Sequence, residues 1–153
     1  MITKYIIGDI TETELKYIAH GVNCQNVMGA GVAKALYTKF PEVKNRYHRY
    51  FDRLGDSIDF LGDVSTCYIT DNKMVYNLHT QLNYGNDNKR YVNYAAIVRC
   101  FQQLKGNIPN QTLAIPKIGC GLAGGDWKFV EQLINDTVGD ELEIWVYTLP
   151  EKT

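Results

Sequence analysis

The amino-acid sequence predicts an α/β sandwich built around a mostly parallel or mixed sheet. Two observations carry this prediction. Short strand-like segments alternate along the chain with segments that have one apolar helical face, and no internal repeat, low-complexity tract or linker divides the 153 residues. A chain of this length is long enough for one domain with a sizeable core and too short for two. We therefore expect residues 1–153 to form a single domain.

Six short segments are apolar and mostly bounded by turn residues, which is typical of strands. The segments are residues 5–7, 17–22, 64–70, 74–78, 112–115 and 142–149. A Gly-Asp pair ends the first segment, and Pro116 ends the fifth. The third and fourth segments are joined by Asp-Asn-Lys at residues 71–73, so we expect these two strands to form a hairpin.

Four other segments repeat apolar residues every three or four positions, which is the spacing of one helix face. The repeating residues are Val32, Leu36 and Phe40; Val43, Tyr47 and Phe51; Ile97, Phe101 and Leu104; and Trp127, Val130 and Ile134. The first helix is expected to begin directly after a glycine pair, and the second to carry Pro41 in its first turn. The third is expected to reach back towards Tyr91.

Composition excludes several classes of protein. The formal net charge of −1 gives no basic face for duplex nucleic acid. The four cysteines are scattered without a CxxC pair, which argues against a zinc site and a disulfide scaffold. The first residues lack the pattern of a secretory signal, and no segment approaches the length of a membrane span. We expect a cytoplasmic protein with no metal, cofactor or membrane partner.

Two glycine-rich loops follow predicted strands and precede predicted helices. The first contains NCQNVMGAGVAKAL at residues 23–36, and the second contains KIGCGLAGGDW at residues 117–127. Glycines expose backbone N–H groups and permit positive φ, and amides at a helix N-terminus bind anions. Two such loops facing each other would suit a diphosphate, although neither fits the dinucleotide fingerprint or the Walker pattern. For either loop alone, a tight turn without a ligand remains an equal alternative.

Three motifs in order resemble those of macrodomains. They are GDI at residues 8–10, HGVNCQNVMGAGVA at residues 20–33 and IGCGL at residues 118–122. The resemblance covers the whole chain and is closest to the branch that contains terminal ADP-ribose glycohydrolases and ADP-ribose 1''-phosphate phosphatases. It implies a three-layer α/β/α sandwich with a mixed central sheet and a cleft for ADP-ribose.

The resemblance also implies a set of ligand-binding residues. Asp9 is implied to accept a hydrogen bond from the adenine amino group, with capping of the following turn as the alternative. The first loop is implied to border the distal ribose and the second to wrap the diphosphate, where Cys120 would act through its backbone. The full set is Asp9, Ile10, Gln25, Met28, Gly29, Ala30, Gly31, Val32, Gln81, Gly119, Cys120, Gly121, Leu122 and Ala123.

The sequence departs from the glycohydrolases of this branch, which are implied to cleave with a lysine and an aspartate. The corresponding positions here hold Gln81 and Ala123. Gln81 cannot form a covalent adduct with an opened sugar, and Ala123 cannot act as a base. Asp126 lies close in sequence, but we expect it to cap the following helix. The glycohydrolase mechanism is therefore not expected.

A phosphatase acting on ADP-ribose 1''-phosphate, or a related ADP-ribosyl hydrolase, is the function that the sequence favours. His20, Asn23 and Asn26 are the candidates for its polar chemistry, with His79 as an outside candidate that is more often structural. His20 resembles a histidine of the phosphatase members, and a purely structural role for it is given equal weight. The alternative function is a non-catalytic module that binds ADP-ribose. The expected partners are ADP-ribose, its 1''-phosphate or an ADP-ribosylated macromolecule.

Residues 83–91 are polar and rich in glycine and asparagine, which is typical of a mobile loop. Such a loop could close over the distal ribose, with Lys89 or Arg90 meeting a terminal phosphate. An exposed connector is the favoured alternative.

Overall fold

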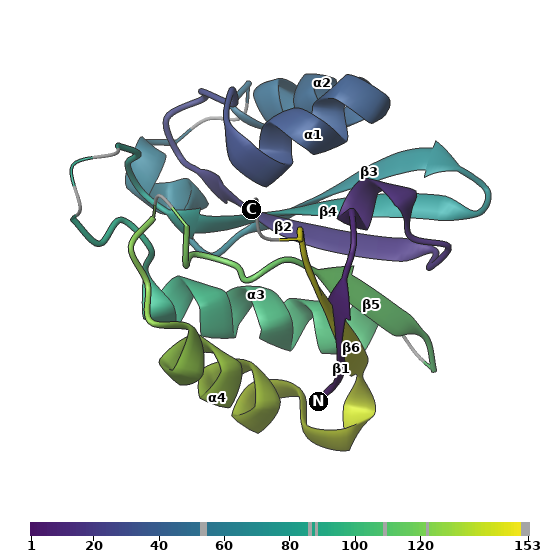
Figure 1. The fold of residues 1–153 in the computed structure, drawn as a ribbon. Coiled ribbons are helices and arrows are strands. Elements are labelled where there is room, and N and C mark those ends of the chain that lie inside the picture. Colours follow the sequence, from purple (N-terminus) through teal and green to yellow (C-terminus); the bar gives the residue numbers. More distant parts are fainter. Residues whose placement is uncertain (53–54, 86, 88, 109, 122, 151–153) are drawn as a thin grey trace.

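The computed structural model describes residues 1–52, 55–85, 87, 89–108, 110–121 and 123–150. Within these residues a mixed six-stranded sheet lies between two helical layers. Helices α1 and α2 cover one face, and α3 and α4 cover the other (Figure 1). The predicted three-layer α/β/α sandwich is confirmed.

The sheet brings the carboxyl ends of five parallel strands to one edge. The strands are β1 (Ile2–Ile7), β2 (Tyr17–Asn23), β3 (Val64–Thr70), β4 (Lys73–Gln81), β5 (Thr112–Ile115) and β6 (Glu143–Thr148). Their spatial order is β1-β6-β5-β2-β4-β3. Only β3 is antiparallel to its described neighbour, β4, so the predicted hairpin is confirmed. In sheets of this kind, ligands bind beyond the carboxyl ends of the parallel strands.

The four predicted helices are all present, and three short 3₁₀ helices were not predicted. The helices are α1 (Gly31–Lys39), α2 (Glu42–Tyr50), α3 (Tyr94–Asn107) and α4 (Trp127–Val138), and the 3₁₀ helices are η1 (Ile10–Glu12), η2 (Ser57–Phe60) and η3 (Gly139–Glu141). Helix α3 does not reach back to Tyr91. The side chain of Asn93 accepts a hydrogen bond from the Ala96 N–H group and ends the helix there.

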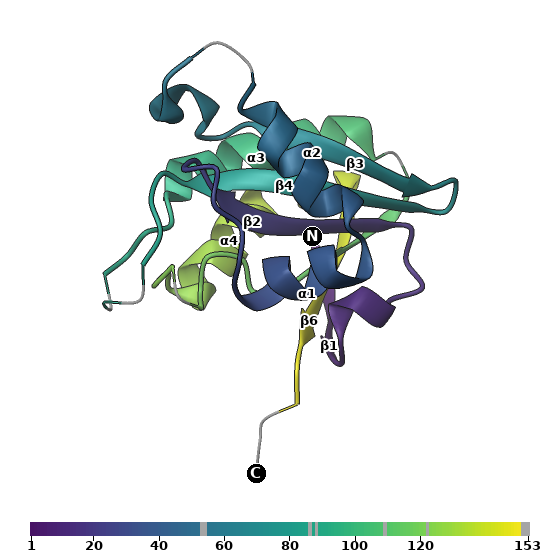
Figure 2. The ribbon, with the colours of Figure 1, turned by 90° about the horizontal axis from the view of Figure 1, so that it is seen from above.

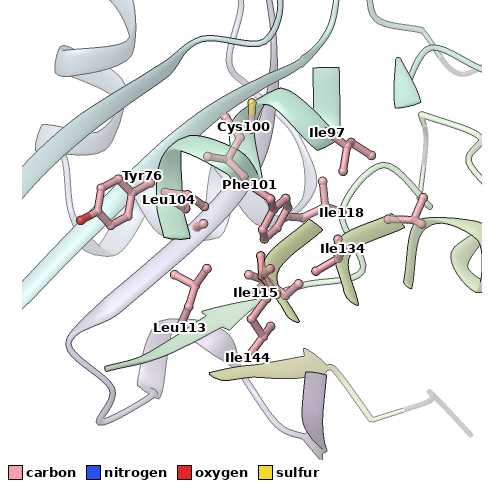
Figure 3. Close-up of a cluster of buried hydrophobic side chains, with 14 of the residues drawn as sticks. Tyr76, Ile97, Cys100, Phe101, Leu104, Leu113, Ile115, Ile118, Ile134 and Ile144 are labelled. Carbon is pink, nitrogen blue, oxygen red and sulfur yellow. The ribbon is translucent and has the colours of Figure 1, made fainter. Parts of the chain in front are cut away.

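The core fills both faces of the sheet, which explains the spacing of apolar residues in the sequence. Between the sheet and the α3/α4 layer, Phe101 and Ile134 pack against Ile115 and other fully buried side chains (Figure 3). On the other face, Leu36 and Tyr47 pack towards the sheet from the α1/α2 layer, which lies over the strands in Figure 2. Each such side chain contributes about 1.5–3 kcal/mol by leaving water. No helix in the described part of the chain is long and apolar enough to cross a membrane.

Candidate functional site

A cavity of about 1080 Å³ lies at the sheet edge where the five parallel strands end. Each of these strands, or the loop that follows it, contributes to the wall. The contributing segments are residues 8–10 after β1, 20–23 and 27–33 in and after β2, 81 and 84–85 at the end of β4, 116–121 and 123 after β5, and 147–149 at the end of β6. This volume is at the upper end of the range for small-molecule sites.

The strand order determines how the wall segments are arranged along the cavity. Asp9 follows edge strand β1, whereas Gln81 ends β4, four strand positions away. Neighbouring strands are about 4.8 Å apart, so these two ends of the cavity are separated by about 19 Å. The segments after β6, β5 and β2 lie between them. The cavity therefore suits an elongated ligand that lies across the strand ends.

The N-terminus of α1 opens onto this cavity without a side-chain cap. Ala30 occupies the N-cap position, and its methyl group makes no capping hydrogen bond. The N–H groups of Gly31, Val32 and Ala33 have no hydrogen-bond partner among the described residues. A Cβ atom built on Gly29 or Gly31 would meet nothing within 4 Å. Free amides, the helix dipole and open space together make an anion site.

Hydrogen bonds hold the preceding loop in place and occupy the polar atoms of Asn23. Its amide nitrogen donates to the Val27 carbonyl at 2.8 Å. Its oxygen accepts from the Gln25 N–H group at 2.9 Å and from the buried Tyr47 hydroxyl at 2.7 Å. Asn23 lines the cavity, but its side chain fixes the loop conformation.

The structure does not bring Gln25 or Asn26 to the cavity. The Gln25 side chain donates to the Leu82 carbonyl at 2.9 Å. The Asn26 oxygen lies 2.6 Å from Nδ1 of His48 on α2, and Asn26 has a positive φ of 60°. Neither residue is part of the cavity wall as far as the structure describes the chain. Of the three candidates for polar chemistry, only His20 and Asn23 meet at the cavity.

His20 lies in β2 with its ring buried beside Asn77 of β4. Its Nε2 atom is 2.5 Å from the Asn77 oxygen, and its Nδ1 atom has no partner in the described part of the chain. Burial lowers the pKa of His20 to about 4, although the Asn77 hydrogen bond opposes this shift. The ring is therefore neutral at pH 7, and it cannot act as a cationic proton donor there.

The second candidate histidine, His79, lies outside the cavity wall that the structure describes. Its Nδ1 atom is 3.1 Å from the Asp63 carbonyl oxygen, which can only accept, so Nδ1 donates. The ring stacks against Tyr47 and packs with Tyr50 and Phe51. These contacts support the structural role that the sequence favoured for His79.

The glycines of the second loop have two different uses, which corrects the expectation that all four expose amides to a ligand. Gly119 and Gly124 have φ values of 75° and 73°, and Cβ atoms there would clash with Val92 and with the Lys89 carbonyl. Gly125 donates its N–H group to the Gly119 carbonyl at 2.7 Å. Close packing against residues 89–92 therefore explains why Gly119, Gly124 and Gly125 have no side chain. Gly121 alone among them faces open space at the cavity.

Helix α4 also differs from expectation, because its N-terminus does not add to the anion site. The Asp126 carboxylate accepts from the Lys128 N–H group at 3.1 Å, so the predicted cap is confirmed. The cavity wall includes Ala123 but no described residue of α4. Of the two helices that follow the glycine loops, α1 is the one whose described residues present free amides to the cavity. Leu122, which belongs to the implied ligand set, lies outside the described residues.

The remaining side chains of the implied set lie on the cavity wall, and several have defined partners. Asp9 accepts from the Thr11 N–H group at 2.9 Å and from its hydroxyl at 2.8 Å, so it caps η1. The Gln81 amide donates to the Asn83 carbonyl at 2.8 Å. Cys120 is half-buried, and burial raises its pKa to about 11, so it is a thiol at neutral pH. The other members on the wall are Ile10, Met28, Gly29, Ala30, Gly31, Val32, Gly119, Gly121 and Ala123.

Two parts of the wall were not among the predicted site residues. Tyr84 and Gly85 come from the loop after β4, where the structure does not describe residues 86 and 88. Residues 147–149 come from the last strand, which carries no glycine or catalytic-type motif. Residues 84–85 belong to the glycine- and asparagine-rich loop that the sequence placed near the distal ribose, whereas the sequence signal for residues 147–149 was their position at the end of a predicted strand. Lys89 and Arg90 do not belong to the described wall: Lys89 lies 3.8 Å from Asp87, and Arg90 stacks over the Tyr94 ring.

Comparison with known proteins places this geometry in a family. The model of the Macro domain family matches residues 19–134, which include both glycine loops, most of β2, and strands β3 to β5. The chain is a macrodomain.

Two relatives of this macrodomain match most of its sequence. An uncharacterized 17.5 kDa protein from the tk-vs intergenic region of Enterobacteria phage T4 is 34% identical over 153 residues, covering 94% of both chains. The DNA ADP-ribosyl glycohydrolase of Mycobacterium tuberculosis is 30% identical over 135 residues. That match covers 86% of this macrodomain and 37% of the mycobacterial protein, so the chain spans little more than a third of that relative's length.

Solved structures agree with this assignment. A macrodomain protein from Streptomyces coelicolor has a TM-score of 0.80 at 27% identity, and the match covers 98% of this macrodomain and 100% of that chain. A Thermosipho africanus DarTG structure in complex with ADP-ribose has a TM-score of 0.71 at 22% identity, covering 95% of this macrodomain and 41% of that chain. The second match shows the shared fold alone.

Proposed function

We propose that the cavity of this macrodomain binds the ADP-ribosyl group, either free or attached to a macromolecule. One observation carries the proposal: the uncapped N-terminus of α1, with its three free amides, opens into a cavity that crosses five strand ends. A diphosphate at these amides would lie between two flanking groups, which is the arrangement of adenosine and ribose in ADP-ribose.

The direction of the ligand follows from the side chains at the two ends. The Asp9 carboxylate is a hydrogen-bond acceptor at the β1 end, where it would meet the adenine amino group. His20, Asn23 and Gln81 lie towards the β2 and β4 end, where the distal ribose would lie. The ADP-ribose complex of the DarTG structure supports this choice of ligand.

Binding without hydrolysis of a glycosidic bond is the mode that the side chains support. The relatives include proteins named as DNA ADP-ribosyl glycohydrolases. Gln81 and Ala123 occupy the positions where the resemblance implies a lysine and an aspartate. Neither replacement can attack a sugar or accept a proton at neutral pH. We propose that this chain does not use the mechanism implied for the glycohydrolases.

Hydrolysis of ADP-ribose 1''-phosphate is a second candidate function, in which the free amides of α1 would hold the 1''-phosphate in place of the diphosphate. Phosphoryl transfer depends mostly on positioning and charge stabilisation, which backbone amides supply without a titrating side chain. His20 would not protonate the leaving oxygen in this scheme, because its pKa of about 4 keeps the ring neutral.

Two measurements test these proposals. Isothermal titration with ADP-ribose is expected to show one site with saturable binding, and AMP, which lacks the second phosphate and the distal ribose, is expected to bind more weakly. No binding of ADP-ribose at millimolar concentration would overturn the proposed ligand. Release of inorganic phosphate from ADP-ribose 1''-phosphate decides the second candidate, since binding without release leaves the non-hydrolysing module.

A further inference from the structure

His20 and Asn77 form a buried pair that determines which nitrogen of the His20 ring carries the proton. These residues are register partners in the parallel strands β2 and β4, and both are almost completely buried. His20 belongs to the cavity wall, whereas Asn77 does not belong to the described wall. The pair therefore links a residue of the cavity wall to a buried residue behind it.

The orientation of the Asn77 amide follows from its other contacts. Its nitrogen lies 3.3 Å from the Val43 carbonyl oxygen and 3.4 Å from the Cys67 sulfur. The Val43 carbonyl can only accept hydrogen bonds, so the amide NH₂ group must face it and the amide oxygen must face His20. Helix α2, which carries Val43, thereby fixes the direction in which Asn77 presents its acceptor.

The tautomer of His20 follows in turn. An amide oxygen that faces Nε2 at 2.5 Å requires the ring proton to be on Nε2. In the neutral ring, Nδ1 then carries a lone pair and no proton. This nitrogen is buried and has no partner among the described residues. A buried acceptor without a partner is costly, and such atoms in native proteins call for an explanation.

We propose that Asn77 is a positioning residue that locks His20 in its Nε2–H tautomer, so that Nδ1 accepts a hydrogen bond from a hydroxyl group of the bound ligand. The inference rests on the proposed function for the identity of that ligand, which supplies hydroxyls on its distal ribose. A lone pair at Nδ1 repels phosphate oxygens, which carry no proton at neutral pH. The His20 wall is therefore selective for a neutral hydroxyl, and the anionic groups lie at the α1 amides instead.

The first test needs no ligand. Nitrogen NMR on protein labelled at its three histidines is expected to show His20 at pH 7 with a protonated Nε2 and an unprotonated Nδ1. His79 is expected to show the reverse, because its Nδ1 donates to the Asp63 carbonyl. A His20→Leu variant identifies the His20 signals. A protonated Nδ1 on His20 would overturn the proposal.

A pair of variants tests the role of Asn77. Asn77→Ala removes the acceptor at Nε2, so His20 is expected to show a mixture of both tautomers. Ser65→Ala is the matched control, because Ser65 is the buried register partner of Asn77 in β3 and its hydroxyl makes no hydrogen bond to the described residues. It is expected to leave the His20 tautomer unchanged. If Asn77→Ala folds and keeps a pure Nε2–H tautomer, Asn77 is not the positioning residue.

The second test adds ADP-ribose. The Nδ1 resonance of His20 is expected to move on saturation, and His20→Leu is expected to weaken binding about tenfold. Saturable binding with an unmoved Nδ1 resonance would overturn the hydroxyl contact while leaving the proposed function intact. No binding at all would overturn the proposed function and the hydroxyl contact together, and the ligand-free spectrum would still decide the tautomer.

Discussion

Gly121 and Gly119 lie two residues apart in the loop after β5, but they have different reasons to be glycine. A Cβ atom on Gly121 would enter open space at the cavity. Gly119 has a φ of 75° and no room for a side chain beside Val92. The position of each Cβ, which depends on the fold, therefore separates a glycine that borders open space in the cavity from one needed for packing.

Gly121→Val is expected to abolish ADP-ribose binding with little change in the midpoint of urea unfolding. The new side chain projects into the space that the diphosphate would occupy, and it meets no described neighbour within 4 Å at its Cβ. Titration calorimetry and urea unfolding measure the two effects. Gly119→Ala is the contrasting variant, expected to lose at least about 1 kcal/mol of unfolding free energy. Unchanged affinity in Gly121→Val would remove the diphosphate from this loop.

The depressed pKa of His20 predicts that acid weakens the fold. In the unfolded chain the imidazole binds a proton near its ordinary pKa of 6.5, whereas in the folded protein it does so only near 4. The unfolded state therefore binds more protons between these values, and stability falls as the pH is lowered from about 6.5 to about 4. The full difference corresponds to about 3 kcal/mol.

The measurement compares urea unfolding of the wild-type protein and His20→Leu at pH 7 and pH 4.5. His79 and the carboxylates are present in both proteins, so their contributions cancel in the comparison. The wild-type protein is therefore expected to lose more unfolding free energy than His20→Leu between pH 7 and pH 4.5, and the difference is the contribution of His20. Equal losses in the two proteins would mean that His20 is not buried in its neutral form.

Single residues of the site were predicted from motifs with uneven success, for a physical reason. Glycine-rich loops carry a backbone signal that the sequence displays, so Gly29, Gly31 and Gly121 could be located at the cavity. The direction of an amide side chain depends on partners that are remote in sequence. The Asn26 side chain contacts His48 on α2, and no sequence motif indicates this contact.

At the scale of elements, the N-termini of α1 and α4 differ in whether a side chain caps them. Helix α4 has an aspartate cap, whereas α1 has Ala30 at the same position and leaves three amides free. A missing cap costs a helix about 1 kcal/mol, so the arrangement at α1 exchanges stability for an open anion site.

Ala30→Asp is expected to stabilise the fold and weaken ADP-ribose binding at the same time. A carboxylate beside the free amides and the positive end of the α1 dipole contributes about 0.3–1 kcal/mol, and it repels the diphosphate. Thermal unfolding and titration calorimetry measure the two quantities. A variant that binds ADP-ribose as tightly as the wild-type protein would show that the diphosphate does not lie at α1.

Asp126→Ala is the matched variant for α4. Loss of its cap is expected to lower the unfolding free energy by about 1 kcal/mol, because the Lys128 N–H group loses its acceptor. ADP-ribose affinity is expected to remain unchanged, since no described part of α4 borders the cavity. A loss of affinity would mean that the loop before α4 depends on this cap.

Helices and strands were predictable from the sequence because their apolar spacing reports burial directly. The ends of a helix are harder to predict from apolar spacing where a side-chain cap determines them, as Asn93 does at the start of α3. The three 3₁₀ helices were not predicted, because segments of three or four residues are too short to display a period.

At the scale of the whole molecule, the ligand site is distributed over most of the chain. The two ends of the cavity belong to β1 and β4, about 19 Å apart across the sheet. Composition and motifs predicted the layers but could not give the strand order, which depends on long-range pairing. That order is what converts separate loops into one elongated cavity.

Hydrogen exchange is expected to show which end of the cavity holds which part of the ligand. ADP-ribose is expected to protect backbone amides of residues 8–10 and of residues 81–85, because it spans the cavity. AMP is expected to protect only the first group, since it would reach no further than the middle strands. The comparison is made by mass spectrometry at equal fractional saturation. Protection of residues 81–85 by AMP would reverse the proposed direction of the ligand.

The pairing of β1 with β6 has a consequence for how the protein is made. Of the six described strands, β1 leaves the ribosome first and β6 last, yet β1 has β6 as its neighbour in the sheet. The wall around Asp9 therefore cannot assemble until β6 has been translated, whereas β2, β3 and β4 can already associate in the nascent chain. A truncated product that ends before Glu143 would leave β1 without the neighbouring strand β6 that the structure describes, and the Asp9 end of the cavity would lack its support.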